Sequence, residues 1–419
     1  MRNNIQNIDV VMDKRTVSKE LVKKYQLEDE VKNGCSQFVG IIYKDTDKGV
    51  NILVSLPFNY MDVDDFQSRD IKEKFSNIQT ILTSILKYNR TQGLMGLDDF
   101  HCSFPINAYN QIYSFYQKYG LYRENITNIK QGQNGNIDWK NTFRRSNSFI
   151  NTKTNTIVYF PFYQKEKIVT SNLITECMAF VLNYTKEYFK DILQLPISAE
   201  LENFGINHSL LNNKEYVIQQ LKEELGHTYK DYLKNLITNL IRFFEKLETN
   251  YSYDFSMIQF EFHNVWEHAV NEFLNNHFIG VDEDESDTLF QFTNEKIEKF
   301  FFQKDSRSYD LVNANNRLEP DHYYYDKKNN VQYIFDSKYM EKLNGLNHKQ
   351  LIYGILYGKG VRKTFNTLVL PGLPSIDKNS VRGAKHVEVK EDLLPDSINE
   401  LIIYQIRLNE KFVLESFIN

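Results

Sequence analysis

The chain has 419 residues, of which 41% are hydrophobic, with a formal net charge of −5 and a pI near 6.0. A chain of this length can bury more than one hydrophobic core, so we expect two or three domains. Because the net charge is negative, the protein as a whole does not attract nucleic acid electrostatically. Any contact with DNA must therefore come from local basic patches.

Cysteine usage and hydropathy narrow the class further. The three cysteines, Cys35, Cys102 and Cys177, form neither a CxxC pair nor a Cys/His spacing, which argues against disulfides and against a zinc site. No segment approaches the roughly 18 apolar residues of a membrane span, and the N-terminus lacks the apolar run of a signal peptide. We therefore expect a cytoplasmic protein with no membrane contact.

The first part of the chain is expected to be rich in β-strands. Residues 36–60 predict two strands around a DTDKG turn, and residues 154–164 predict another strand. Helices are expected at about 66–88 and 107–118. These elements predict a mixed, β-rich N-terminal domain over residues 1–165, which would dock a partner and is a candidate for DNA contact.

The texture changes in the middle of the chain. From Thr170 to about Lys246 apolar residues recur at helical spacing, with almost no Gly or Pro. This pattern predicts a helical linker domain over residues 166–255.

The last third of the chain alternates between helix and strand. We expect a helix at about 264–276, a hairpin at 320–338 and a helix at about 347–359. Strand-like stretches follow, with the sequences NTLVL, HVEVK and ELIIYQIRL. This order predicts a compact α/β domain over residues 256–419, and an α/β multidomain protein as a whole.

The segment LEPDHYYYDKKNNVQYIFDSKYM, residues 318–340, is typical of a β-hairpin. DKKNN supplies turn residues between two runs rich in Tyr, Val, Ile and Phe. If Lys327 to Asn330 form the loop, Asp326 pairs with Val331. The loop boundary could differ by one or two residues.

This register brings three charged side chains together. Asp321 falls opposite Asp336, and Lys338, two residues further along the strand, projects from the same face as Asp336. Paired carboxylates repel one another unless a cation lies between them, and all-oxygen ligands select magnesium, with manganese as the alternative. A lysine in the same pocket can orient a water and offset charge on a phosphorane-like transition state, which indicates metal-assisted phosphodiester hydrolysis. The alternative is an ordinary polar hairpin with Asp at its strand ends.

Two helices flank this hairpin in sequence and offer further candidates. Glu267 lies on the same helical stripe as Val270 and Leu274, so it could serve as an extra metal ligand or as a base for the water. The alternative is an acidic residue that the helix dipole favours near an N-terminus. On the second helix Gln350 and Tyr353 are candidates for contact with the DNA backbone, or simply part of a half-buried amphipathic helix.

Other signals point away from function. GILYGKG, at 354–360, is not a phosphate loop because three residues separate its first two glycines and no Ser or Thr follows Lys359. We therefore expect this chain to bind no nucleotide. The acidic run VDEDESD, at 281–287, lacks the EF-hand glycine and is expected to be a solvated loop. His322 alternates with Asp321 along its strand, so we expect its side chain to point to the opposite face.

The order Glu267, Pro-Asp at 320–321, DSK at 336–338 and a helix beginning HKQLIY resembles the nuclease core of the PD-(D/E)xK superfamily. The VWEHAV and IFDSKY stretches more narrowly resemble LlaJI-type restriction endonucleases, which are similar to the McrC nuclease subunit. GNIDWKNTF at 135–143 resembles the Gly-x-Ile-x-Trp-x-x-Thr signature of the N-terminal part of that group. The resemblance covers roughly residues 120–190 and 260–360.

The resemblance implies roles for individual residues. Asp321 and Asp336 would bind the metal, the backbone carbonyl of Ser337 would join them, Lys338 would act on the water, and Glu267 would complete the site. It also implies a separate McrB-like AAA+ nucleotidase that recruits and drives the nuclease. Gln and Tyr on the following helix are three residues apart here, one fewer than in RecB-like nucleases.

The leading hypothesis is a Mg²⁺-dependent endonuclease subunit of a restriction or phage-defence system, which cuts double-stranded DNA and works with the AAA+ partner. One alternative is a non-catalytic assembly adaptor that stimulates a motor partner. Another is a stand-alone PD-(D/E)xK nuclease of a different defence or repair system. The sequence leaves open whether the protein forms an oligomer.

Overall fold

The computed structural model divides into two compact units. Unit 1 comprises the described residues within 1–104 and 251–419, and unit 2 comprises those within 105–190 and 194–250. The residues that the structure describes are 5–46, 49–91, 99–132, 136–189, 201, 203–247, 255–284, 287–297, 299–308, 313, 315, 317–343, 345, 347–398 and 400–419.

Unit 1 contains a five-stranded N-terminal sheet in the order β1-β5-β4-β11-β6. The strands predicted on either side of the DTDKG turn are confirmed as an antiparallel pair, with Tyr43 opposite Ile52; residues 47 and 48 of that turn lie outside the described residues. Strand β11 joins this sheet although it follows β5 by about two hundred residues. The strands are β1 Ile5–Met12, β4 Val39–Thr46, β5 Gly49–Leu56, β6 Phe100–Cys102 and β11 Phe255–Gln259, with the short pair β2 Val31–Lys32 and β3 Cys35–Ser36.

Helices cover this sheet through apolar stripes. Helix α1 (Lys19–Tyr25) packs Tyr25 onto the β-sheet core. The single helix predicted at about 66–88 is instead two, α2 (Val63–Ser68) and α3 (Ile71–Thr91). The break falls at Asp70, whose Oδ1 accepts a 2.9 Å hydrogen bond from the N–H of Glu73 and so begins a new helix.

A second, mixed sheet of unit 1 has the order β16-β17-β18-β21-β20. Strand β17 is antiparallel to β16 and parallel to β18, and β18 is parallel to β21. The connection from β17 to β18 contains α12, as a parallel crossover requires. The strands are β16 His322–Asp326, β17 Val331–Ser337, β18 Lys363–Gly372, β20 Ala384–Glu388 and β21 Ile402–Asn409, and α12 is His348–Gly358.

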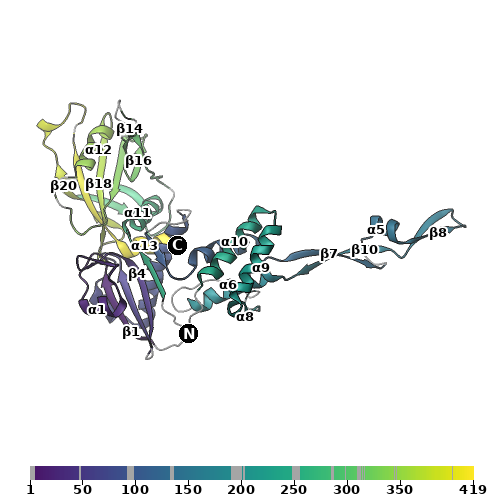
Figure 1. Ribbon diagram of the computed structural model, residues 1–419. Helices are drawn as coiled ribbons and strands as arrows, with labels where there is room; N and C mark the ends of the chain where they lie inside the picture. The colour runs from purple at the N-terminus through teal and green to yellow at the C-terminus, as the bar shows by residue number, and fades with distance from the viewer. Residues whose placement is uncertain are drawn as a thin grey trace. The chain divides into compact units, whose positions relative to one another are not determined.

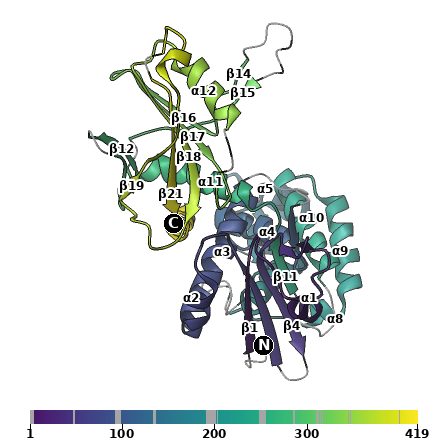
Figure 2. The same cartoon turned by 90° about the vertical axis from the view of Figure 1, so that its left-hand side faces the viewer.

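Neighbouring residues of β17 show what covers each face of this sheet (Figure 2). Ile334 packs against Tyr353 and Tyr357 of α12. Phe335, which points to the other face, meets the rings of Phe278 and Phe290. Helix α12 therefore lies on one face, and the small sheet β12-β13-β19 lies on the other beside α11. These elements are α11 His263–His277, β12 Phe278–Glu283, β13 Thr288–Phe292 and β19 Ser380–Arg382.

The remaining elements of unit 1 are short. They are β14 Arg307–Ser308, β15 Arg317–Leu318, the 3-10 helix Glu391–Leu393 and the C-terminal helix α13 Glu410–Ile418. Helix α13 packs against α3 and α11, so it links the two sheets of the unit.

Unit 2 combines a helical bundle with a long β-ribbon (Figure 1). Helices α4, α6, α9 and α10 pack on one another, which confirms the helical texture predicted for the middle of the chain. The ribbon of β7 and β10 leads from this bundle to α5 and to the hairpin β8–β9. The elements are α4 Ile106–Tyr119, β7 Glu124–Gln131, α5 Trp139–Arg145, β8 Asn147–Asn151, β9 Thr156–Phe160, β10 Tyr163–Thr170, α6 Leu173–Tyr188, α8 Ser209–Asn212, α9 Lys214–His227 and α10 Asp231–Lys246.

The GNIDWKNTF segment forms the junction between the ribbon and α5. Asp138 caps α5 by accepting a hydrogen bond from the N–H of Asn141 at 3.2 Å. The buried hydroxyl of Thr142 accepts a hydrogen bond from the N–H of Tyr163 at 3.0 Å. Thr142, a residue of the sequence signature, and Asp138, which lies within it, thus shape the backbone here. Gly135 lies outside the described residues.

The sequence-based division at residues 165 and 255 stays a prediction. Packing groups the described residues differently, because residues 105–165 belong with the helices of unit 2 and β11 belongs with the N-terminal sheet. The coarser expectation of a mixed α/β protein is confirmed. Among the described helices, none is both long enough and apolar enough to cross a membrane.

Candidate functional site

The hairpin of β16 and β17 has the register that the turn sequence predicts. Asp326 pairs with Val331, and His322 pairs with Phe335. Oδ1 of Asp326 accepts hydrogen bonds from the N–H groups of Lys328 at 2.9 Å and Asn329 at 3.2 Å. Asn330 adopts a left-handed conformation with φ +53°, which closes the loop.

At the other end of the hairpin the structure brings the predicted acidic pair and lysine together. Asp321 directly precedes β16, and its Oδ2 accepts a 3.0 Å hydrogen bond from the N–H of Ser337. Asp336, which directly precedes Ser337 in β17, is 1% exposed and forms an ion pair with Lys338. Lys338 leaves the end of β17, where its own N–H donates to the carbonyl of Val369 at 2.8 Å. The positions are as expected, and the chemical roles stay predictions.

The electrostatics of Asp321 reflect this crowding. Burial, together with the negative charges of Asp336 and Glu267, raises the pKa of Asp321 to about 7. Lys338 and the Ser337 N–H act in the opposite direction. A carboxyl group that holds its proton near neutral pH lies where a cation would be favourable.

Glu267 approaches the same cluster from helix α11. Its Oε1 lies 2.6 Å from Nζ of Lys304, and its charge acts on Asp321. Burial lowers the pKa of Lys304, but the hydrogen bond and charge of Glu267 outweigh burial and raise it overall. Sequence reasoning missed Lys304 because the segment around it has no motif or periodicity.

His322 lies beneath the site and is fully buried. Its Nδ1 lies 2.9 Å from Nδ2 of Asn271, and its Nε2 lies 2.9 Å from Oγ of Ser337. Because an amide nitrogen can only donate, Nε2 carries the proton and donates to Ser337. Burial lowers the pKa of His322 to about 3, so the ring is neutral and holds Ser337 in place.

Gln350 and Tyr353, the candidates for DNA contact, lie on the inner face of α12 and are fully buried. The hydroxyl of Tyr353 donates to the carbonyl of Glu319 at 2.6 Å, which supports the segment before Asp321. Within the described part of the chain, the side-chain amide of Gln350 has no hydrogen-bond partner. Neither side chain reaches the surface in this arrangement, so their contact with DNA stays a prediction.

The oxygen atoms of Asp321, Asp336 and Ser337 suit a hard divalent cation, but Glu267 does not join them in this structure. Apart from the ion pair with Lys338, neither oxygen of Asp336 has a hydrogen-bond partner among the described residues. With Asp321 and the Ser337 carbonyl this makes an all-oxygen set. Among the described residues no three His, Cys, Asp or Glu side chains are arranged to hold a metal together. Glu267, the expected extra ligand, is engaged by Lys304 instead.

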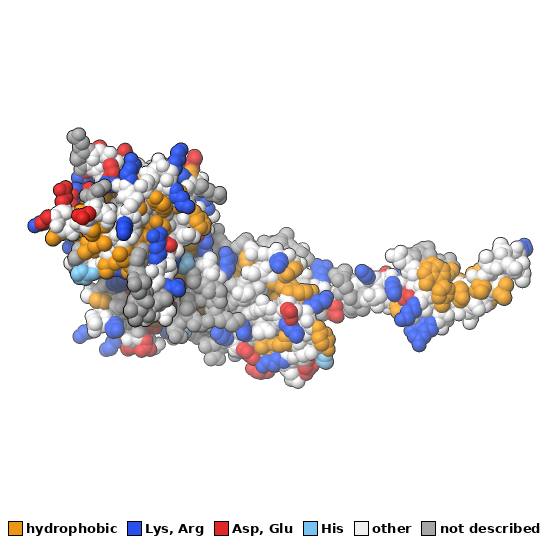
Figure 3. All heavy atoms as spheres, turned by 90° about the horizontal axis from the view of Figure 1, so that it is seen from above, with side chains coloured by type: hydrophobic (Ala, Val, Ile, Leu, Met, Phe, Trp, Pro, Cys, Tyr) orange, Lys and Arg blue, Asp and Glu red, His pale blue; other side chains and the backbone are white. Residues whose placement is uncertain are grey.

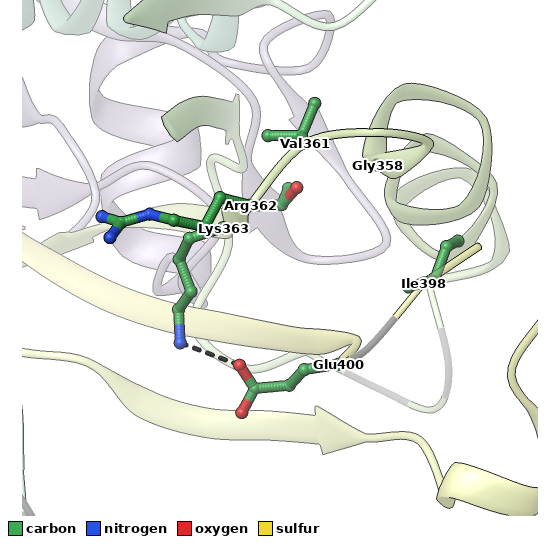
Figure 4. A pocket seen from close by; sticks show the side chains of 7 residues that line it. Gly358, Val361, Arg362, Lys363, Ile398 and Glu400 are labelled. Carbon is green, nitrogen blue, oxygen red and sulfur yellow. Dashed lines mark hydrogen bonds and ion pairs between the residues drawn. The ribbon is translucent and has the colours of Figure 1, made fainter. Parts of the chain in front are cut away.

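A surface hollow lies at the opposite end of the same sheet (Figure 4). It is lined by Lys363, whose ammonium lies 2.8 Å from Glu400, and by the turn after α12. Lys363 pairs with Val331, whereas Asp336 pairs with Leu368 further along β18. The hollow is therefore separate from the acidic site.

Fold and site together define an α/β protein with an acidic pair, of which Asp336 is buried, and a lysine at one end of a mixed sheet. The sequence matches the LlaJI restriction endonuclease family over residues 38–387. The chain belongs to this family, which confirms the resemblance to LlaJI-type restriction endonucleases inferred from its motifs.

No curated protein matches the sequence. A chain in the solved assembly of Thermococcus gammatolerans McrB AAA+ hexamers with bound McrC is similar over 98% of each chain, with 12% identity and a TM-score of 0.36.

Proposed function

We propose that this protein is the Mg²⁺-dependent DNA endonuclease subunit of a restriction or phage-defence system, with a PD-(D/E)xK site on its second sheet. The observation that carries the proposal is the meeting of Asp321, Asp336 and Lys338 at the end of the hairpin. Membership of a restriction endonuclease family supports the same conclusion.

Asp321, Asp336 and the carbonyl of Ser337 would hold the magnesium ion, with manganese as a substitute. When bound, the ion would lower the pKa of a water molecule and polarise the scissile phosphate. Glu267 would add a ligand once Lys304 releases it. The all-oxygen character of this set favours these two ions over zinc or copper.

The chain's own residues supply orientation and charge. Lys338 holds an ammonium group beside Asp336, with 24% of its side chain exposed. It can therefore donate to an attacking water or to a phosphate oxygen and offset the charge that develops there. Ser337 is held through its hydroxyl by His322 and through its N–H by Asp321, which fixes the direction of its peptide group.

Near-isosteric substitutions test these roles. We expect Asp336→Asn and Lys338→Met each to lower Mg²⁺-dependent cleavage of double-stranded DNA by at least about a hundredfold. Lys328→Met, at the exposed turn of the same hairpin, is the matched control and should cleave normally. Retained cleavage in either site variant would remove the assigned roles. A wild-type protein that never cleaves but stimulates a partner's nucleotide hydrolysis would establish the adaptor function instead.

We also propose that the tip of the unit 2 ribbon docks the AAA+ partner. The hairpin β8–β9 exposes Phe149 (56%), Ile150 (70%) and Ile157 (61%). Figure 3 shows apolar side chains gathered beside lysines and arginines at this end of the unit. Isolated two-stranded hairpins are marginally stable, and exposed apolar clusters of this kind mark protein-binding surfaces.

This docking is tested by charge substitution at the tip. Ile150→Asp with Ile157→Asp should abolish co-purification with the AAA+ nucleotidase partner while leaving the helical content of the protein unchanged. Lys153→Asp, in the turn of the same hairpin, is the control for added negative charge. Undiminished partner binding by the double variant would show that docking occurs elsewhere.

A further inference from the structure

Lys304 is delivered to the acidic site by a backbone that is anchored on both sides. The N–H of Phe302 donates to Oδ1 of Asn275 on α11 at 2.6 Å. Gln303 exchanges backbone hydrogen bonds with Tyr323 of β16, at 2.9 and 3.2 Å. The residue before Lys304 is thus held to the strand that follows Asp321, and the side chain extends from there to the cluster.

The contacts of Lys304 are those of a counter-ion. Its ammonium lies 2.6 Å from Oε1 of Glu267 and interacts electrostatically with Asp321 and Glu319. Lys338 likewise forms an ion pair with Asp336. Lys304 and Lys338 therefore form ion pairs with Glu267 and Asp336, whereas no ion pair between a lysine and Asp321 is found among the described residues.

We propose that Lys304 competes with the divalent cation for Glu267: it holds this carboxylate in the metal-free protein and so lowers the affinity of the site for metal. The inference rests on the proposed function, because it takes the site to bind a metal. A cation already placed on a ligand must be displaced before that ligand can join the coordination sphere, and its displacement offsets part of the metal's binding free energy.

Calorimetric titration of the full chain with Mn²⁺ tests the proposal. We expect Lys304→Met to bind Mn²⁺ about three- to fivefold more tightly than wild type, as loss of a half-exposed ion pair predicts. Without metal, Lys304→Met should melt at a lower temperature than wild type, and Mn²⁺ should remove this difference. Equal or weaker Mn²⁺ affinity in Lys304→Met would overturn the proposal.

Two companion variants show whether Lys304 acts through Glu267. Lys304→Arg keeps the charge and should bind Mn²⁺ like wild type. In a Glu267→Gln background Lys304→Met should no longer change the affinity, because the carboxylate that it releases is absent. An equal effect in both backgrounds would contradict the mechanism. Lys299→Met is the control, since Lys299 lies in the same segment but donates to the carbonyl of Ile279 at 2.6 Å.

Failure of this inference and failure of the proposed function give different results. If wild type binds no Mn²⁺ and matches Asp336→Asn in the titration, the metal site itself is absent. If wild type binds Mn²⁺ and Asp336→Asn does not, while Lys304→Met equals wild type, the metal site stands and the competition is excluded.

Discussion

The hydroxyl oxygen of Tyr339 accepts a 2.7 Å hydrogen bond from the backbone N–H of Phe58, 281 residues earlier in the chain. Tyr339 directly follows Lys338, and its carbonyl accepts a 2.7 Å hydrogen bond from Nζ of Lys14. Its ring packs against those of Phe58 and Phe262. Residues of the N-terminal half of unit 1 therefore hold the end of the strand that carries the candidate site.

Tyr339→Phe tests this support. The substitution leaves the buried N–H of Phe58 without an acceptor, so we expect the free energy of unfolding to fall by about 1–3 kcal/mol in a urea titration. Tyr325→Phe is the control, because its hydroxyl bonds Asn330 near the hairpin turn and water can replace it there. Equal stability losses in the two variants would show that the Phe58 contact has no special weight.

Asp13 gives the protein a predictable dependence of stability on pH. Burial raises the pKa of Asp13 from 3.8 to about 6, against the lowering effects of Lys14 and the Tyr339 hydroxyl. Between those two values the folded state binds more protons than the unfolded state. The contribution of Asp13 to stability therefore falls as pH rises through this window and levels off above about pH 6.

Asp13→Asn removes this titration. The unfolding free energy of wild type minus that of Asp13→Asn should fall by up to about 3 kcal/mol between pH 4 and pH 6. Chemical denaturation of both proteins over this range measures the difference. A difference that does not vary with pH would mean that Asp13 titrates normally.

Asp321 predicts proton release when a metal binds, if the proposed function holds. Because its pKa is raised to about 7, below that pH a divalent ion must displace a proton, and affinity should fall about tenfold per pH unit. Above pH 7 the affinity should be level. Titration with Mn²⁺ at pH 6 and pH 8, in buffers of different ionisation enthalpy, counts the protons. Asp321→Asn should release none, and the same proton release from this variant would point to another group.

Gly40 predicts a large loss of stability on substitution. It has φ +145°, and an added Cβ would clash with the carbonyl oxygen of Met257 on the neighbouring strand β11. We expect Gly40→Ala to lower the unfolding free energy by about 3 kcal/mol or more. Gly226→Ala is the control, because that helical glycine has open space around it and alanine should stabilise α9 by up to about 1 kcal/mol. Similar thermal stability of the two variants would contradict the clash.

The candidate site was predictable where its geometry is local. The turn DKKNN and the alternation of the flanking runs set the register, and the register alone places Asp321 beside Asp336 and Lys338 on the same side as Asp336. Adjacent residues of a strand alternate between faces, so no distant contact was needed for this step.

The break between α2 and α3 was missed, although Asp70 at the start of α3 is a recognisable cap.

The distant contacts were not predictable. Lys304 reaches the site only because Gln303 pairs with Tyr323, and nothing in the residues around Lys304 selects that pairing. No strand was predicted at residues 255–259, yet they form β11 and pair with β4. Both backbone pairings depend on which parts of the chain pack together during folding, and the periodicity of apolar residues does not specify this.

By itself, the amino-acid sequence determined the hairpin, its register and the proximity of Asp321, Asp336 and Lys338, because turn chemistry and strand alternation act over a few residues. Only the tertiary structure decided that Lys304 forms an ion pair with Glu267 and that the backbone N–H of Phe58 donates to the hydroxyl of Tyr339. Those contacts join segments that are far apart along the chain, and they form only where packing of the two sheets and α11 brings the backbones together.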